Sequence, residues 1–77
     1  MVFETIRKLI SEQLDYDEEK ITEETDFLKD LNADSLDVVE LTMSVEDAFS
    51  IQEIPEDALR ELHTVGDLVA YVKQAIQ

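Results

Sequence analysis

The stretch LNADSLDVVEL, residues 31–41, contains the start of a helix. Asp34 is a residue type that caps helix N-termini, and Asp37 adds an acid in the first turn, where the helix dipole favours negative charge. At about 100° per residue, the apolar side chains that follow gather on one side of a helix that begins at Ser35; they are Val38, Leu41, Val45 and Phe49. The stretch therefore predicts an amphipathic helix that runs from Ser35 to Phe49 or Ser50.

Apolar residues at helical spacing predict one main helix before this stretch and another after it. The first ends near Asp15, and its apolar stripe is Phe3, Ile6, Ile10 and Leu14, flanked by Leu9. The last begins after Thr64, because Thr64 and Asp67 have the spacing of a capping box. Its expected buried stripe is Val65, Leu68, Val69, Val72 and Ile76.

Two less regular segments join these helices. Residues 15–34 form a connection too long to lack structure in a small domain, so we expect a helical turn near Asp26 to Asp30 and core contacts from Ile21, Phe27, Leu28 and Leu31. Pro55 favours the first position of a short helix, anchored by Leu59 and Leu62. No segment alternates apolar and polar residues as a strand would. The predicted fold class is all-α: a single domain, residues 1–77, folded as a small four-helix bundle with three main helices, one short helix and a long first loop.

Composition narrows the classes of function. Twenty acids against six Lys and Arg residues give a formal net charge of −14, which argues against nucleic acids and anionic membranes as partners and suits proteins with basic patches. The chain has no cysteine that could act as a nucleophile or form a disulfide. The N-terminal MVFETIRKLI has too short an apolar run for a signal peptide, and no stretch reaches the ~20 apolar residues of a membrane span. We therefore expect a cytoplasmic monomer with no stable membrane insertion.

Candidate catalytic and metal sites are incomplete. Ser35 has no base near it in the sequence, and the single histidine, His63, lies before a helix cap far along the chain, so we expect no enzyme. Residues 15–26 place acids at the spacing of a calcium-binding loop, but Lys20 replaces the glycine of its sharp turn and Asp26 replaces the final glutamate. We expect no dedicated metal site, only weak divalent-cation binding at the two ends of the second main helix: Asp30, Asp34 and Asp37 at its start, and Glu46, Glu53 and Asp57 at its end.

One face of the second main helix has the features of a docking surface. Leu36 and Met43 project away from the apolar stripe, beside the acids Asp37, Glu40 and Asp47,. Single exposed apolar residues are common, but two that share a face with a rim of carboxylates are typical of an interface. Thr42, at the edge of the stripe, either donates to the carbonyl oxygen of Val38 or lines an internal cavity.

Asp34-Ser35-Leu36 resembles the phosphopantetheine attachment motif of acyl carrier proteins. The resemblance extends over the whole chain, through FETIRKLISEQL, FLKDL, IPEDAL and TVGDLVAYV. It implies that a phosphopantetheinyl transferase attaches phosphopantetheine covalently to Ser35, next to Asp34, and that acyl groups are carried as thioesters on the terminal thiol of this cofactor. It also implies docking to fatty acid synthesis enzymes with basic patches. The residues that match the recognition residues of the family are Leu36, Asp37, Glu40, Met43 and Glu46, and the helical wheel adds Asp47.

Three features depart from the family pattern. Asn32 and Ser50 stand where glycine is common, and FSIQEIP has one residue more than the usual spacing. Asparagine tolerates positive φ, so we expect little effect at Asn32. Because of the extra residue, the sequence does not predict the path of the chain between the second and third helices. Two alternative functions also remain open at this point: a carrier for a specialised route such as polyketide or D-alanyl transfer, and an acidic interaction domain that is never modified.

Overall fold

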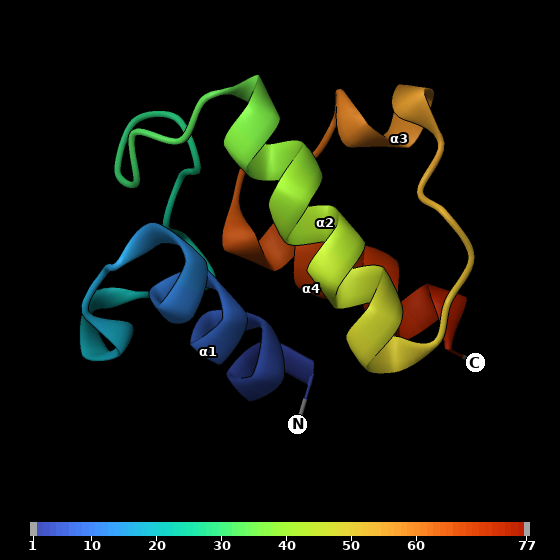
Figure 1. Ribbon diagram of the computed structural model, residues 1–77, viewed down its shortest axis with the longest axis horizontal. Coiled ribbons are helices and arrows are strands. Elements are labelled where there is room, and N and C mark those ends of the chain that lie inside the picture. The colour runs from blue at the N-terminus through green and yellow to red at the C-terminus, as the bar shows by residue number, and fades with distance from the viewer. Residues whose placement is uncertain (1, 77) are drawn as a thin grey trace.

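The computed structural model describes residues 2–76 and consists of helices joined by ordered loops (Figure 1). In chain order the elements are α1 (Val2–Leu14), the 3₁₀ helix η1 (Glu18–Lys20), α2 (Ser35–Phe49), α3 (Glu56–Leu59) and α4 (Val65–Ala75). The extended backbone within this range pairs only at one isolated antiparallel bridge, between Asp26 and Thr64. The all-α prediction, with three main helices, one short helix and a long first loop, is therefore confirmed.

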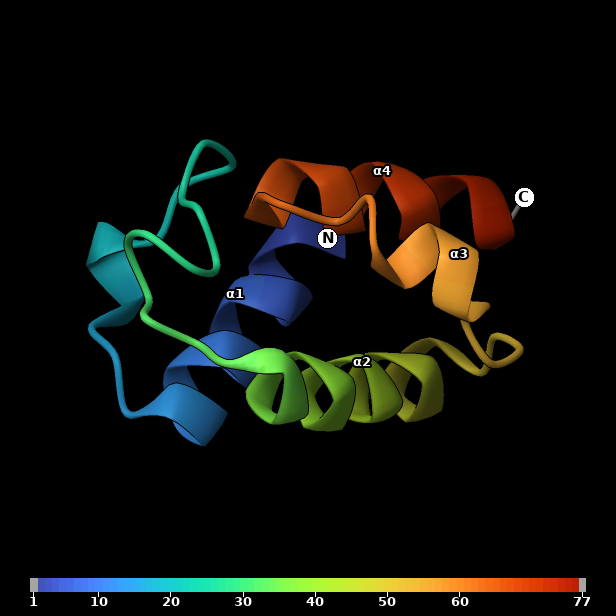
Figure 2. The same cartoon turned by 90° about the horizontal axis from the view of Figure 1, so that it is seen from above.

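The helix α1 packs against both α2 and α4, and it is the element that joins the two halves of the bundle. Figures 1 and 2 show α2 and α4 running in the same general direction, with α3 and the long first loop at opposite sides of the molecule. No helix among residues 2–76 is long and apolar enough to cross a membrane.

The core is built from the apolar stripes that the sequence predicts. Its buried members are Ile6, Ile10, Ile21, Phe27, Leu31, Leu41, Val45, Ile54, Val65, Leu68, Val69 and Val72. Two predicted core residues are wrong: Leu28 is 68% exposed and Ile76 is 47% exposed. Leu28 lies in a tight turn that directs its side chain outward, and Ile76 follows the last residue of α4, so the helical spacing no longer governs its direction.

The long first loop is anchored by backbone hydrogen bonds to the start of α4. The amide of Phe27 donates to the carbonyl oxygen of His63 at 3.0 Å, and the amides of Val65 and Gly66 donate to the carbonyl oxygens of Thr25 and Glu23 at 2.9 and 2.8 Å. These bonds satisfy backbone carbonyl groups of the loop and the first amides of α4, and they hold this part of the loop in one path,.

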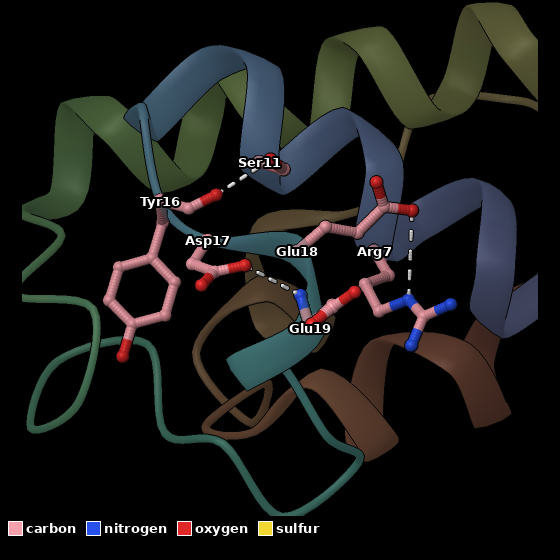
Figure 3. Close-up of polar contacts among 6 residues, drawn as sticks. All are labelled: Arg7, Ser11, Tyr16, Asp17, Glu18 and Glu19. Carbon is pink, nitrogen blue, oxygen red and sulfur yellow. Dashed lines mark hydrogen bonds and ion pairs between the residues drawn. The ribbon is translucent and has the colours of Figure 1, made fainter.

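The helical turn predicted near Asp26 to Asp30 is present. Residues 27–30 form a hydrogen-bonded turn, in which the amide of Asp30 donates to the carbonyl oxygen of Asp26, four residues earlier, at 3.0 Å. A 3₁₀ helix that the sequence did not predict begins after Asp17, whose carboxylate accepts from the amide of Glu19 at 3.0 Å. Figure 3 shows how this segment is tied to α1: the hydroxyl of Ser11 donates to the carbonyl oxygen of Tyr16 at 2.6 Å, and Arg7 pairs with Glu18 at 3.8 Å.

The connection that carries the extra residue is held by a side chain of α2. The carboxylate of Glu46 accepts a hydrogen bond from the amide of Ile54 at 2.8 Å, and Ile54 is buried. Pro55 then takes the cap position of α3, with φ −60° and ψ 152°, rather than the first helical position that the sequence predicts. Leu59 and Leu62 are half-buried against the core, as expected.

Candidate functional site

The start of α2 is held by two carboxylates that cap it reciprocally. Asp34 Oδ1 accepts from the amide of Asp37 at 2.9 Å, and Asp37 Oδ2 accepts from the amide of Asp34 at 3.2 Å. This capping box confirms Asp34 as the N-cap and gives Asp37 a structural role that the sequence did not predict. Asn32, two residues earlier, has φ 53°, the left-handed conformation that asparagine tolerates,.

Ser35 is the first residue of α2, and it is exposed. Because the carboxylate of Asp34 makes the capping bond, the Ser35 hydroxyl is not needed to hold the helix. Its position beside the first turn also brings it next to amide groups that have no partner within the helix. The hydroxyl is therefore accessible at the end of a rigid element.

A cavity of about 590 Å³ lies beside Ser35. Its walls come from the long first loop, the first turn of α2 and the segment before α4, and the apolar residues among them include Phe27, Ala33, Val38 and Leu62. Besides Ser35, its polar lining residues are Asp26, Lys29, Asp34 and His63. Sequence reasoning did not assign the loop residues to this site, because no helical period relates residues of a loop to a helix start.

His63 lines the same cavity as Ser35 although it is far from it in the sequence. Both residues line the cavity, which sequence distance alone did not suggest. No hydrogen bond joins the Ser35 hydroxyl to the His63 ring among the contacts of residues 2–76, and the backbone amide of His63 donates to Asp67 Oδ2 at 3.0 Å. The geometry therefore does not provide the activated pair that a serine nucleophile requires.

Two carboxylates near the cavity are held in the ionised form by backbone amides. The pKa of Asp26 is lowered, chiefly by the amide of Lys29 and then by that of Leu28. The pKa of Asp67 is lowered by the amides of His63 and Thr64. Both carboxylates act as structural acceptors rather than as proton donors.

The face of α2 that points away from the core is apolar along its middle. Leu36 and Met43 are 64% and 58% exposed, which agrees with the helical wheel, and Val39 between them is 40% exposed and was not predicted. Of the predicted acidic rim, Glu40 and Asp47 are exposed, whereas Asp37 and Glu46 are half-buried. Exposure of large apolar side chains on one helix face is consistent with an interface.

Two polar residues of α2 make side-chain hydrogen bonds that the sequence did not predict. Thr42 is buried, and its hydroxyl donates to the carbonyl oxygen of Val39 at 2.8 Å, so the predicted bond to Val38 is wrong. The side chain of Gln13 on α1 forms a hydrogen bond with the hydroxyl of Ser44. This contact joins α1 to the middle of α2.

The weak metal clusters expected at the two ends of α2 are not preformed. Within residues 2–76, no three His, Cys, Asp or Glu side chains come together in a group that could hold a metal ion. Weak divalent-cation binding at Asp30, Asp34, Asp37, Glu46, Glu53 and Asp57 therefore stays a prediction. Several of these carboxylates already accept backbone amides: Asp30 from Asp26, Asp34 and Asp37 from each other, and Glu46 from Ile54.

Comparison with known proteins places these features in a family. Residues 4–72 match the family described as "Phosphopantetheine attachment site". The chain is 49% identical over 75 residues to an acyl carrier protein from Phenylobacterium zucineum, covering 97% of this chain and 94% of that protein. It is 48% identical over 73 residues to an acyl carrier protein from Borreliella burgdorferi, covering 95% and 90%. A solved structure of acyl carrier protein from Enterococcus faecalis superimposes with a TM-score of 0.80 at 32% identity, over 96% of this chain and 92% of that one.

Proposed function

We infer that this chain, which belongs to the phosphopantetheine attachment site family, is an acyl carrier protein that carries acyl groups on a phosphopantetheine arm joined to Ser35. When bound, the arm supplies a terminal thiol that holds acyl groups as thioesters, which a chain without cysteine cannot supply itself,. Fatty acid synthesis is the usual setting of such carriers, and we propose it for this chain.

The residues around Ser35 fit such an arm. The hydroxyl is exposed at the N-terminus of a helix of 15 residues, where backbone amides favour a phosphate group,. The cavity beside it is walled largely by apolar side chains, among them Phe27, Val38 and Leu62. The observation that carries the proposal is the division of roles between neighbours: Asp34 caps the helix, which leaves Ser35 exposed for modification.

Intact mass measurement tests the attachment site. The apo chain is incubated with coenzyme A and a phosphopantetheinyl transferase, and we expect the wild type to gain one phosphopantetheine increment. Ser35→Ala should keep its helical circular dichroism and gain nothing, while the control Ser44→Ala should still be modified. A wild-type chain that stays unmodified would favour the acidic interaction domain, and an increment on Ser35→Ala would place the arm elsewhere.

We further propose that the exposed face of α2 docks the transferase and synthesis enzymes through their basic patches. The residues concerned are Leu36, Asp37, Glu40, Met43, Glu46 and Asp47. Support comes from the exposed apolar Leu36 and Met43 beside exposed carboxylates, in a chain of net charge −14. Charge at the rim of an interface mainly governs association, whereas a central apolar anchor mainly governs dissociation.

Binding kinetics test this docking face. Glu40→Lys should slow association and weaken its salt dependence, and Met43→Ala should speed dissociation. Glu12→Lys on α1, an exposed acid with the same charge change, is the matched control. If Glu12→Lys slows association as much as Glu40→Lys does, net charge rather than this face governs docking. A partner panel that includes polyketide and D-alanyl-transfer enzymes distinguishes the specialised routes from fatty acid synthesis.

A further inference from the structure

The cavity beside Ser35 has a single Lys or Arg side chain in its lining, that of Lys29. The chain holds only six such residues against twenty acids, so a cation at this place is unusual for its surface. Two acids, Asp26 and Asp34, line the same cavity, together with Ser35 and His63.

The turn that carries Lys29 is held in place by hydrogen bonds. Asp26 Oδ1 accepts from the amides of Leu28 and Lys29, both at 2.9 Å, and Asp30 Oδ2 accepts from the amide of Asp26 at 2.8 Å. The amide of Phe27 is bonded to the segment before α4. The backbone of Lys29 is thereby fixed beside the cavity, while its side chain is exposed.

The ammonium of Lys29 is not committed to a protein carboxylate. Arg7 pairs with Glu18 and Arg60 with Glu56, whereas Lys29 forms no ion pair with any carboxylate of residues 2–76. The pKa of Asp26 is lowered chiefly by the backbone amide of Lys29 and also by the charge of Lys29, but the hydrogen bonds of that carboxylate come from two backbone amides. A positive charge is therefore available next to the residue that we propose is modified.

We propose that Lys29 is a positioning residue that binds the phosphodiester of the arm on Ser35 and so orients the arm over the cavity. This inference rests on the proposed function. Modification of Ser35 places a new negative charge beside Asp34 in a chain that already has a net charge of −14. A lysine ammonium binds phosphate as a point charge, and it offsets repulsion that no other Lys or Arg of the cavity lining can offset.

Phosphorus NMR of the modified chain tests the inference. Wild type, Lys29→Gln, Lys29→Arg and Lys20→Gln are each converted to the modified form, and the ³¹P resonance is followed from low to high salt. Lys20→Gln has the same charge change, and Lys20 does not line this cavity, although it shares a second, polar pocket with Lys29. An exposed ion pair changes the fraction of molecules whose arm contacts the lysine by about two- to fivefold. The difference in ³¹P chemical shift between low and high salt should therefore be at least about twofold smaller in Lys29→Gln than in the wild type.

The control variants separate a contact from a change in net charge. Lys20→Gln should show the same salt-dependent change in ³¹P chemical shift as the wild type. Lys29→Arg should show most of that change, because arginine keeps the positive charge. If Lys29→Gln and wild type respond equally to salt, or if Lys20→Gln reduces the response as much as Lys29→Gln does, the inference is overturned while the mass increment still supports Ser35 as the attachment site. A wild-type chain that gains no arm overturns the proposed function and this inference together.

Discussion

Replacement of the single glycine by alanine tests the junction between the long first loop and α4. The amide of Gly66 donates to the carbonyl oxygen of Glu23 at 2.8 Å. A Cβ added to Gly66 would lie 2.8 Å from that same oxygen and 3.3 Å from the Cβ of Glu23. Because the closest atom belongs to the backbone, no side-chain rotation can relieve the contact, and the loop would have to move away from the helix.

Opposing contributions set the size of the effect. Overpacking of this kind costs about 1–3 kcal/mol, and weakening of the Gly66–Glu23 hydrogen bond costs about 1 kcal/mol more. Alanine in place of glycine within a helix contributes about 1 kcal/mol in the other direction. We therefore expect Gly66→Ala to lower the free energy of unfolding by about 1–3 kcal/mol, where each kcal/mol corresponds to a fall of about 4–8 °C in Tm for a domain of this size.

Urea unfolding of the apo chain, followed by circular dichroism, measures this change. Ala70→Gly, at an exposed site in the same helix, is the control for helix propensity and should cost about 1 kcal/mol without any steric contact,. The slope of the free energy against urea should stay constant if both variants change stability alone. A Gly66→Ala chain as stable as the wild type, or more stable, would refute the steric reasoning.

Three further predictions concern stability. Ser50 has φ 54° at the end of α2, so Ser50→Gly should relieve backbone strain and raise the stability by up to about 1 kcal/mol; a lower Tm would contradict this. Asp67 has a lowered pKa, so the stability advantage of wild type over Asp67→Asn should be complete above the ordinary value of 3.8 and should disappear as the pH falls through the lower folded pKa,. Urea unfolding across that pH range checks it, and a constant difference would count against the assignment. Thr42→Val should change stability by less than about 1 kcal/mol, because the Val39 carbonyl keeps its bond within the helix; Thr42→Ala, which also removes a buried methyl group, is the comparison and should be less stable.

The sequence predicts the parts of the fold that depend on contacts between residues no more than one or two helical turns apart. Asp34 and the pair Thr64–Asp67 cap their helices as predicted, because a capping side chain bonds amides only three residues away. The buried stripe of α4 follows from the period of the helix, up to the residue at which the helix ends. The sequence near Ser35 was therefore sufficient to place this residue at the start of a helix, without knowledge of the tertiary contacts.

The parts that sequence reasoning missed depend on contacts between distant segments. Leu28 was expected in the core because it is apolar, but the carboxylate of Asp26 holds its amide and turns the segment outward. Lys29 and His63 reach one cavity only because the loop pairs with the backbone before α4. For Thr42, periodicity gave the burial of the side chain but could not decide between the carbonyl oxygens three and four residues earlier.

The capping box also bears on the proposed contact between Lys29 and a phosphodiester on Ser35. A helix N-terminus normally attracts anions through its unpaired amides and its dipole. In α2 the amides of Asp34 and Asp37 are already bonded to carboxylates, and those two negative charges offset much of the positive end of the dipole. The start of α2 therefore attracts a phosphodiester through fewer amides than an uncapped helix would. In our proposal the ammonium of Lys29, on the facing loop, adds to this attraction without loosening the cap.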